Sequence, residues 1–320
     1  MKRIVIILSP FFILILLLQC KTTEKQETSS KSRMIYKMLK SADTKDKTFV
    51  KLLNNPERGT NEISASKINK KLQVEERIVN GFKVLTFQSP SATNKHIVFF
   101  HGGAYVAEAM KGHRILIEKL ALSYHFKVSF IDYPLAPEND ATLCLQMIQQ
   151  AYIELIAANL NDEFYLLGDS AGGGLALSLL QLLRDNNRTI RPKKTVLLSP
   201  WLDISMSNPE ILNFVDKDVL LSLSGLNECA KLYAREMDLK NPKVSPIYGN
   251  LENLSEIKVF VSTHELFYPD CSLLKSKIDS VQGSTIDLSF KKEMIHDWLV
   301  LPIPESDETI QEVADFFMSE

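Results

Sequence analysis

Residues 168–174 read GDSAGGG and place a serine between glycines, where one apolar run ends and another begins. Glycine is costly inside a strand or a helix, yet four of the chain's twelve glycines fall in these seven positions. The pattern is typical of a nucleophile elbow, a sharp strand-to-helix turn that exposes a serine hydroxyl. Gly168 and Gly172 must then be small, because such a turn brings neighbouring groups together. We therefore expect Ser170 to be a nucleophile.

A serine hydroxyl is a poor nucleophile and needs a base that is oriented by an acid. With an elbow of this type, the partners follow along the chain in the order serine, acid, histidine. Only two of the six histidines, His264 and His296, lie downstream of Ser170. His296 follows a predicted strand and lies in a loop suited to a base, whereas we expect His264 at the loop surface.

Two carboxylates in the stretch STHELFYPDC are candidates for the orienting acid. Glu265 comes just after a predicted strand, where its side chain can reach a histidine on a loop. Asp270 directly precedes a predicted helix, a place where aspartate caps free N–H groups. We favour Glu265 and keep Asp270 as the alternative acid.

Backbone donors for an oxyanion are expected at two places. Gly102 and Gly103 follow a predicted strand in the stretch FFHGGAY and allow the backbone N–H groups to face the serine. Ala171 begins the helix after the elbow, where N–H groups have no helical acceptor. One such donor is typically worth ~10²–10³ in rate. The predicted oxyanion hole is therefore Gly102, Gly103 and Ala171, and His101 is expected to be a structural hydrogen-bonding residue.

Strands and helices alternate along most of the chain, which predicts an α/β fold. A hairpin is predicted over 76–88, joined by Asn80-Gly81. Further strands are predicted at 96–100, 127–133, 163–168, 195–199, 257–262 and 285–290. Helices are predicted at 112–125, 141–160, 171–184, 270–282 and 307–318. This alternation predicts a mostly parallel eight-stranded sheet with helices on both faces. The segment 205–240 has no strand pattern and is predicted to be an insertion over one end of the sheet.

The first residues differ from the rest of the chain. Lys2 and Arg3 precede an apolar run over 4–18, which is typical of a secretory signal. The run ends at Cys20 in a way that resembles a bacterial lipoprotein signal, with a plain uncut signal anchor as the alternative. We expect a signal peptide over 1–19, a lipidated Cys20 and a location at the membrane of the bacterial cell envelope.

The remaining divisions follow from composition. Residues 20–33 combine the lipidation cysteine with a polar tether. Residues 34–73 are predicted to form one or two helices without a core of their own, and residues 74–320 the main domain.

The net charge of −2 and the absence of a basic block argue against nucleic-acid binding. The other cysteines match no metal or disulfide framework, so we expect buried thiols and no metal site. These cysteines are Cys144, Cys229 and Cys271.

Several motifs together make residues 74–318 resemble the hormone-sensitive lipase family of α/β-hydrolases. The motifs are HGGAY (101–105), IDYPLAPE (131–138), GDSAGG (168–173), SPWLD (199–203), VSPIYG (244–249), HELFYPD (264–270) and MIHDW (294–298). In the family's acid loop, the first carboxylate is catalytic and the later aspartate is structural, which supports Glu265. Ala104 and Pro134 depart from the family's usual residues, but neither departure removes a catalytic group.

The resemblance implies an α/β-hydrolase fold with a helical cap built from residues 34–73 and 205–240. It also implies a carboxylic ester hydrolase without a cofactor, which acts on small-molecule esters of short to medium acyl chains. Ser170, Glu265 and His296 would then work through an acyl-enzyme. A deacetylase or amidase with the same machinery, and a membrane-tethered binding protein without catalysis, are the alternatives. The natural substrate, the oligomeric state and the role of Asp169 stay open.

Overall fold

The computed structural model describes residues 28–186 and 191–319. The predicted signal peptide, Cys20 and the first part of the tether lie outside these residues. Eight strands form one sheet in the order β1-β2-β4-β3-β5-β6-β7-β8. The strands are β1 (Gln73–Val79), β2 (Phe82–Gln88), β3 (Lys95–Phe100), β4 (Lys127–Ile131), β5 (Glu163–Asp169), β6 (Lys194–Leu198), β7 (Glu256–Ser262) and β8 (Thr285–Lys291).

The predicted hairpin is confirmed as β1 and β2. Asn80 and Gly81 have φ angles of 50° and 87°, and Val79 pairs with Phe82 across the turn. Positive φ at both turn residues matches the twist of the two strands, which explains the Asn-Gly pair. β2 also pairs antiparallel with β4, and all later neighbours in the sheet are parallel. The sheet is therefore mostly parallel, as predicted.

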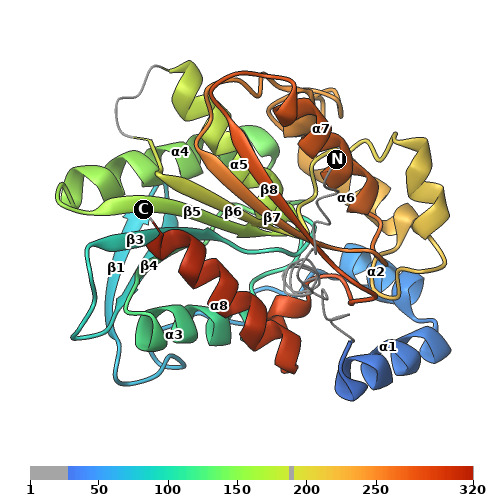
Figure 1. The fold of residues 1–320 in the computed structure, drawn as a ribbon, viewed down its shortest axis with the longest axis horizontal. Helices are drawn as coiled ribbons and strands as arrows, with labels where there is room; N and C mark the ends of the chain where they lie inside the picture. Colours follow the sequence, from blue (N-terminus) through green and yellow to red (C-terminus); the bar gives the residue numbers. More distant parts are fainter. Residues whose placement is uncertain (1–27, 187–190, 320) are drawn as a thin grey trace, which may run out of the picture.

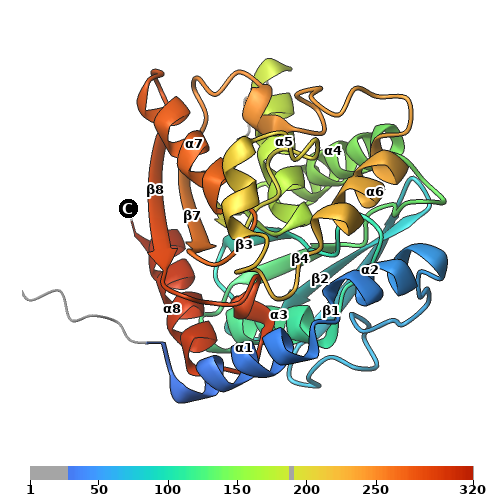
Figure 2. The same cartoon turned by 90° about the vertical axis from the view of Figure 1, so that its right-hand side faces the viewer.

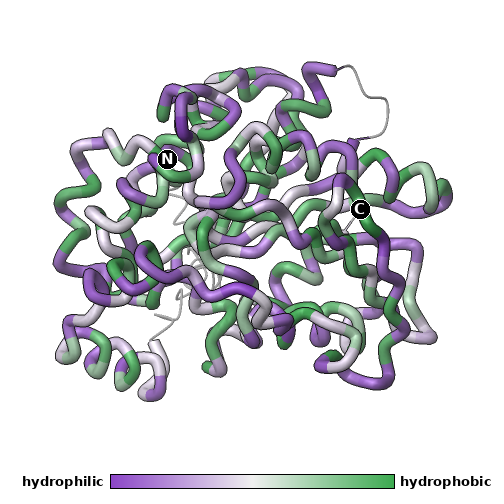
Figure 3. Tube along the Cα trace, turned by 180° about the vertical axis from the view of Figure 1, so that it is seen from behind, coloured by the Kyte–Doolittle hydropathy of each residue, from purple (hydrophilic) through white to green (hydrophobic). Residues whose placement is uncertain are grey.

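Helices cover both faces of the sheet (Figure 1). α3 (Lys111–Ser123) and α8 (Pro304–Met318) pack on one face. α4 (Ala141–Ala158), α5 (Ala171–Asp185) and α7 (Tyr268–Asp279) pack on the other face. Two apolar cores result, one on each side of strands whose residues are almost all buried. Hydrophobic stretches accordingly run through the middle of the chain trace, while many outer turns are hydrophilic (Figure 3).

The N-terminal helices and the insertion pack together. α2 (Lys45–Asn54) lies beside α6 (Leu223–Ala234), beyond the carboxyl ends of the parallel strands, and α1 (Ser30–Ala42) leads to it from the side of α8 (Figure 2). Lys45 Nζ donates to Val215 O at 2.6 Å, and the Ser222 hydroxyl donates to Asp46. Phe49 packs directly against Gly225 of α6, where a Cβ atom would collide with its ring. The segment 205–240 contains the 3₁₀-helix η2 (Pro209–Phe214) and α6 but no strand.

The structure differs from the predicted tether at its end. α1 begins at Ser30, within residues 20–33, because Ser29 accepts a hydrogen bond from Ser32 N and caps the helix. The Ser29 N–H and the Ser32 hydroxyl in turn donate to Glu305 of α8, at 2.6 and 2.7 Å. The last residues of the polar stretch are therefore ordered by a buried carboxylate far away in the sequence.

A second difference concerns α7, which begins at Tyr268 rather than at Asp270. Pro269 lies in the first turn, where its missing N–H has no cost. Asp270 is therefore inside the first turn and does not cap the helix, and this part of the prediction was wrong. Within residues 28–186 and 191–319, no helix has the length and hydropathy needed to cross a membrane.

Candidate active site

The sharp strand-to-helix turn expected at Ser170 is present between β5 and α5. Ser170 has a φ of 50° and a ψ of −117°, a strained conformation for a residue with a side chain. Its N–H donates to Leu198 O at 2.8 Å, and its carbonyl accepts from Trp201 N at 2.8 Å. A Cβ atom on Gly172 would overlap the Phe100 carbonyl, so the helix can approach the sheet only with glycine there. These contacts hold the strained turn in place.

Three side chains that are far apart in the sequence form one hydrogen-bonded chain. Ser170 Oγ lies 3.0 Å from His296 Nε2, and His296 Nδ1 lies 2.5 Å from Glu265 Oε2. A carboxylate accepts only, so Nδ1 carries the proton and Nε2 is free to accept from the serine hydroxyl. The three residues follow β5, β7 and β8, and the carboxyl ends of parallel strands meet at one edge of the sheet.

The second oxygen of Glu265 is also held. Oε1 accepts from Ser199 Oγ at 3.0 Å and from Ser262 N at 2.5 Å, and the residue is fully buried. Asp218 of the insertion accepts from the neighbouring Leu266 N at 3.0 Å and ties the cap to the same loop. The carboxylate therefore has little freedom to move away from His296.

The charge balance of His296 suits a base. Burial would lower the pKa of His296, but the hydrogen bond and the charge of Glu265 outweigh it, so the pKa is raised above 6.5. Phe267 packs edge-on against the imidazole with ring centroids 5.2 Å apart. The ring is therefore both oriented and protected from bulk water.

The structure corrects one of the three expected oxyanion donors. The Gly102 N–H donates to Asp169 Oδ2 at 2.8 Å, so it is already engaged. The reason is that the buried Asp169 carboxylate requires N–H donors, and the Gly102 amide is within its reach. Gly103 lies in the same loop after β3, and Ala171 is the first residue of α5, so its N–H has no helical acceptor.

Other predicted residues are placed as follows. His101 is buried and its Nδ1 donates to Gly102 O at 2.6 Å, which confirms a structural role. His264 is half-buried in the loop before Glu265. Cys144, Cys229 and Cys271 are free buried thiols, as predicted.

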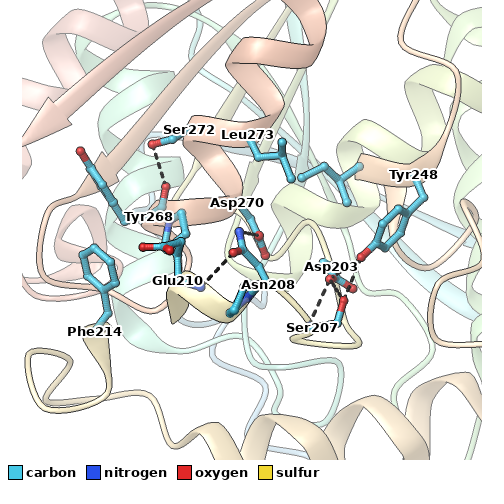
Figure 4. Close-up of a pocket in the computed structure, with 13 residues that line it drawn as sticks. Asp203, Ser207, Asn208, Glu210, Phe214, Tyr248, Tyr268, Asp270, Ser272 and Leu273 are labelled. Atoms are coloured by element: carbon cyan, nitrogen blue, oxygen red, sulfur yellow. Dashed lines mark hydrogen bonds between the residues drawn. The ribbon is translucent and has the colours of Figure 1, made fainter. Parts of the chain in front are cut away.

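Asp270 does not contact His296 but lines a separate cavity of about 590 Å³ (Figure 4). Its Oδ1 accepts from Asn208 Nδ2 at 2.8 Å, and burial raises its pKa to about 6. Phe214, Tyr248 and Tyr268 also line this cavity, which includes none of the residues of the hydrogen-bonded chain. The structure thus pairs His296 with Glu265 and places the alternative acid elsewhere.

Sequence reasoning missed two neighbours of the elbow. His113 of α3 lies 3.1 Å from Asp169 through Nε2, and Asp297 lies 3.7 Å from His296 Nε2 through Oδ2. Asp297 follows the histidine directly in MIHDW. The sequence could not predict that its side chain turns toward the site, because adjacent residues in a loop can point in different directions. His113 follows Gly112 at the start of a predicted helix, and nothing in that pattern predicts a partner across the sheet.

Comparisons with known proteins show the family to which the chain belongs. A family model described as alpha/beta hydrolase fold matches residues 97–300, and the chain belongs to this family. The chain is 27% identical over 263 residues to an esterase from Acinetobacter venetianus, covering 78% of this chain and 84% of the relative. It is 28% identical over 225 residues to an acetyl-hydrolase from Streptomyces hygroscopicus, covering 69% and 74%.

A solved structure is also similar. It is a hormone-sensitive lipase from a metagenome library, with a TM-score of 0.77 and 25% identity, covering 91% of this chain and 99% of that chain. The likeness thus extends over most of this chain and nearly all of that one.

Proposed function

We propose that this protein, a carboxylic ester hydrolase, cleaves esters of short to medium acyl chains through an acyl-enzyme on Ser170. His296 takes the proton of the serine hydroxyl as Oγ attacks the ester carbonyl. Glu265 holds the imidazole in the tautomer that can accept this proton. The same proton then passes from Nε2 to the leaving alcohol, and water repeats the sequence to release the acid.

The negative charge on the carbonyl oxygen needs donors that are oriented in advance. We assign this role to the N–H groups of Gly103, in the loop after β3, and of Ala171, the first residue of α5. Gly102 does not donate in this arrangement, because its N–H is directed toward Asp169. Its role would be to fix the loop that carries Gly103.

The observation that carries the proposal is the unbroken path from Ser170 through His296 to Glu265, with contacts of 3.0 and 2.5 Å. A serine, an imidazole and a carboxylate in this order are the components of acyl transfer. The short-acyl preference is supported by the relative from Streptomyces hygroscopicus, which is named an acetyl-hydrolase.

The test is hydrolysis of p-nitrophenyl esters from acetate to palmitate by the protein and by Ser170→Ala. We expect the highest kcat/KM with short chains, and a loss of at least about 10³-fold in the variant. A burst of p-nitrophenol equal to one per active site would show the acyl-enzyme. Equal activity in both proteins would contradict the role of Ser170.

The alternatives give different results in the same experiment. A deacetylase or amidase would be slow on all these esters but would release acetate from acetylated sugars or amides in a Ser170-dependent way. A binding protein without catalysis would be inactive on every substrate.

We also propose that Cys20 is lipidated and holds the domain at a membrane of the bacterial cell envelope. Support comes from Lys2 and Arg3, the apolar run that follows them and the cysteine at its end. Labelled palmitate should be incorporated into the protein in the bacterial host and not into Cys20→Ser. Equal labelling of the two proteins would exclude this site.

A further inference from the structure

Two aspartates lie close together beside the proposed nucleophile. Asp169 precedes Ser170 and is fully buried, whereas Asp297 follows His296 and its side chain is 14% exposed. Their carboxyl groups converge at Gly102, where a Cβ atom would lie 2.3 Å from Asp169 Oδ2 and 3.1 Å from Asp297 Oδ2. Asp169 Oδ1 and Asp297 Oδ1 are buried and have no other hydrogen-bond partner. Buried oxygens of this kind need a donor, and two ionised carboxylates cannot supply one.

The histidines near the pair bring no positive charge. Met110 N donates to His113 Nδ1 at 2.9 Å, so the ring proton of His113 is on Nε2 and is donated to Asp169 Oδ2. The ring of His113 is therefore neutral. His101 donates from Nδ1 to a carbonyl, its Nε2 has no partner, and burial lowers its pKa to about 4.

Lysine and arginine do not compensate the pair either. In the described part of the chain, the ion pairs of Asp169 and Asp297 involve only histidines. Two adjacent buried carboxylates without a cation are strongly unfavourable, and retention of one proton removes the repulsion. The same proton would satisfy both orphaned oxygens.

We propose that Asp169 and Asp297 share one proton, so that Asp169 is the anionic member and Asp297 a neutral positioning residue beside the oxyanion loop. Asp169 already accepts two N–H donors on Oδ2, from Gly102 at 2.8 Å and from His113 at 3.1 Å. Asp297 Oδ2 has only a long contact of 3.7 Å with His296 Nε2. Its ionised form is therefore less stabilised than that of Asp169, and Asp297 is the weaker acid. This inference rests on the proposed function for its effect on catalysis, but not for the shared proton.

The pKa shifts agree in direction. Burial, followed by the charge of Asp169, raises the pKa of Asp297 well above its usual range. Burial would also raise the pKa of Asp169, but the N–H groups that His113 and Gly102 donate to its Oδ2 favour the ionised form, and its pKa is lowered. Two carboxyl groups whose environments separate their pKa values in this way hold a single proton over a wide pH range.

The position of Asp297 explains why its charge matters. A Cβ atom built on Gly102 would lie 3.0 Å from Ser170 Cβ and 3.1 Å from Asp297 Oδ2, so all three groups are neighbours. A negative charge there would oppose the developing oxyanion and would compete for the proton that His296 Nε2 takes from Ser170 during the reaction. The shared proton prevents both effects and leaves Asp169 free to hold the Gly102 amide.

The titratable groups that face the pair come from four directions. They are His113 of α3, His101 of the loop after β3, Glu265 of the loop after β7, and His296 beside Asp297. Burial would lower the pKa of His296, but Glu265 raises it, and protonation of this base governs the acid side of the profile. An alkaline change in kcat/KM would therefore report the pair.

The test compares the pH profile of kcat/KM for the protein, Asp297→Asn and Asp169→Asn between about pH 6 and about pH 10. The protein should lose activity on the alkaline side, by about tenfold per pH unit beyond the midpoint. Asp297→Asn is neutral at every pH and can still donate to Asp169, so its alkaline loss should disappear. In Asp169→Asn the alkaline midpoint should move to lower pH, because the charge that retains the proton is gone. Asp287→Asn, an exposed carboxylate on β8, is the matched control and should leave the profile unchanged.

A second measurement does not depend on catalysis. The infrared difference spectrum of the protein minus Asp297→Asn at about pH 8 should contain a carboxylic-acid C=O band that shifts in ²H₂O. No such band, or an alkaline loss that persists unchanged in Asp297→Asn, would overturn the inference. A protein that shows the band but keeps its activity in Ser170→Ala would refute the proposed function and leave the shared proton standing.

Discussion

Glu265 contacts His296 through one carboxylate oxygen, at 2.5 Å, while Ser199 and Ser262 hold its other oxygen. Both oxygens are therefore engaged, and the carboxylate cannot rotate away from the imidazole without losing buried hydrogen bonds. The orientation of the proposed base therefore depends on residues at the ends of β6, β7 and β8, and not on one loop alone.

Replacing Glu265 should change both rate and pH dependence. In Glu265→Gln, the charge that outweighs burial is lost, so the pKa of His296 should fall. The acid limb of kcat/KM, which reports protonation of the base, should move to lower pH. The maximum should drop by about 10²–10⁴-fold, because the amide can favour the wrong tautomer. Glu293→Gln, an exposed carboxylate on the histidine loop, is the control and should be neutral. An acid limb that stays in place would show that Glu265 does not set the charge of His296.

The strained backbone of Ser170 should be measurable apart from catalysis. With a φ of 50° and a ψ of −117°, a side chain at this position costs about 1–3 kcal/mol. Ser170→Gly should therefore be more stable than Ser170→Ala by about 1 kcal/mol, although glycine usually destabilises relative to alanine. Urea unfolding of the two inactive variants measures this difference. A more stable alanine variant would mean that the turn is not strained.

The contact between Ser32 and Glu305 should make the contribution of α1 to the stability of the fold depend on pH. Burial would raise the pKa of Glu305, but the Ser32 hydrogen bond and the donors from Ser29 outweigh it, so the pKa is lowered from 4.5. A lowered carboxyl pKa stabilises the fold above pH 4.5, and the contribution is lost as the pH falls through the folded-state pKa. Ser32→Ala should thus cost about 1–2 kcal/mol at neutral pH, and less in acid. The comparison by thermal unfolding uses Ser41→Ala, an exposed serine near the end of the same helix, as its control. An equal cost at neutral and acidic pH would remove the link to Glu305.

The cap should loosen when Phe49 is shortened. Phe49 is 8% exposed and packs on Gly225, whereas its neighbour Val50 is 56% exposed. Phe49→Ala should lower the free energy of unfolding by about 2–3 kcal/mol, and Val50→Ala should change it little. Limited proteolysis should cut the Phe49→Ala variant first within α1 and α2. The kcat/KM for longer acyl esters should rise relative to the kcat/KM for acetate. Identical cleavage of the two variants would show that α2 does not hold the cap.

Much of the architecture could be predicted because its signals are local. The Asn80-Gly81 turn, the apolar strand at 96–100 and the glycines around Ser170 each depend on backbone and side-chain requirements within a few residues. The order of serine, acid and histidine along the chain, together with position after a predicted strand, then favoured His296 as the base. It left two candidates for the acid.

Several features depend on contacts that no short stretch of sequence contains. Asp270 was expected to cap a helix, but the helix begins earlier and its carboxylate turns to Asn208 instead. α1 begins within the predicted tether because Glu305, in the last helix, accepts its first N–H and hydroxyl groups.

By itself, the sequence determined the residue types of the proposed site and the strands that carry them, because periodicity and turn chemistry act over a few residues. Only the tertiary structure decided which carboxylate meets His296 and which N–H groups remain for an oxyanion. It also decided that Asp169 and Asp297 face each other without a cation. These outcomes depend on burial and on distances between strand ends, which arise only when separate parts of the chain pack together.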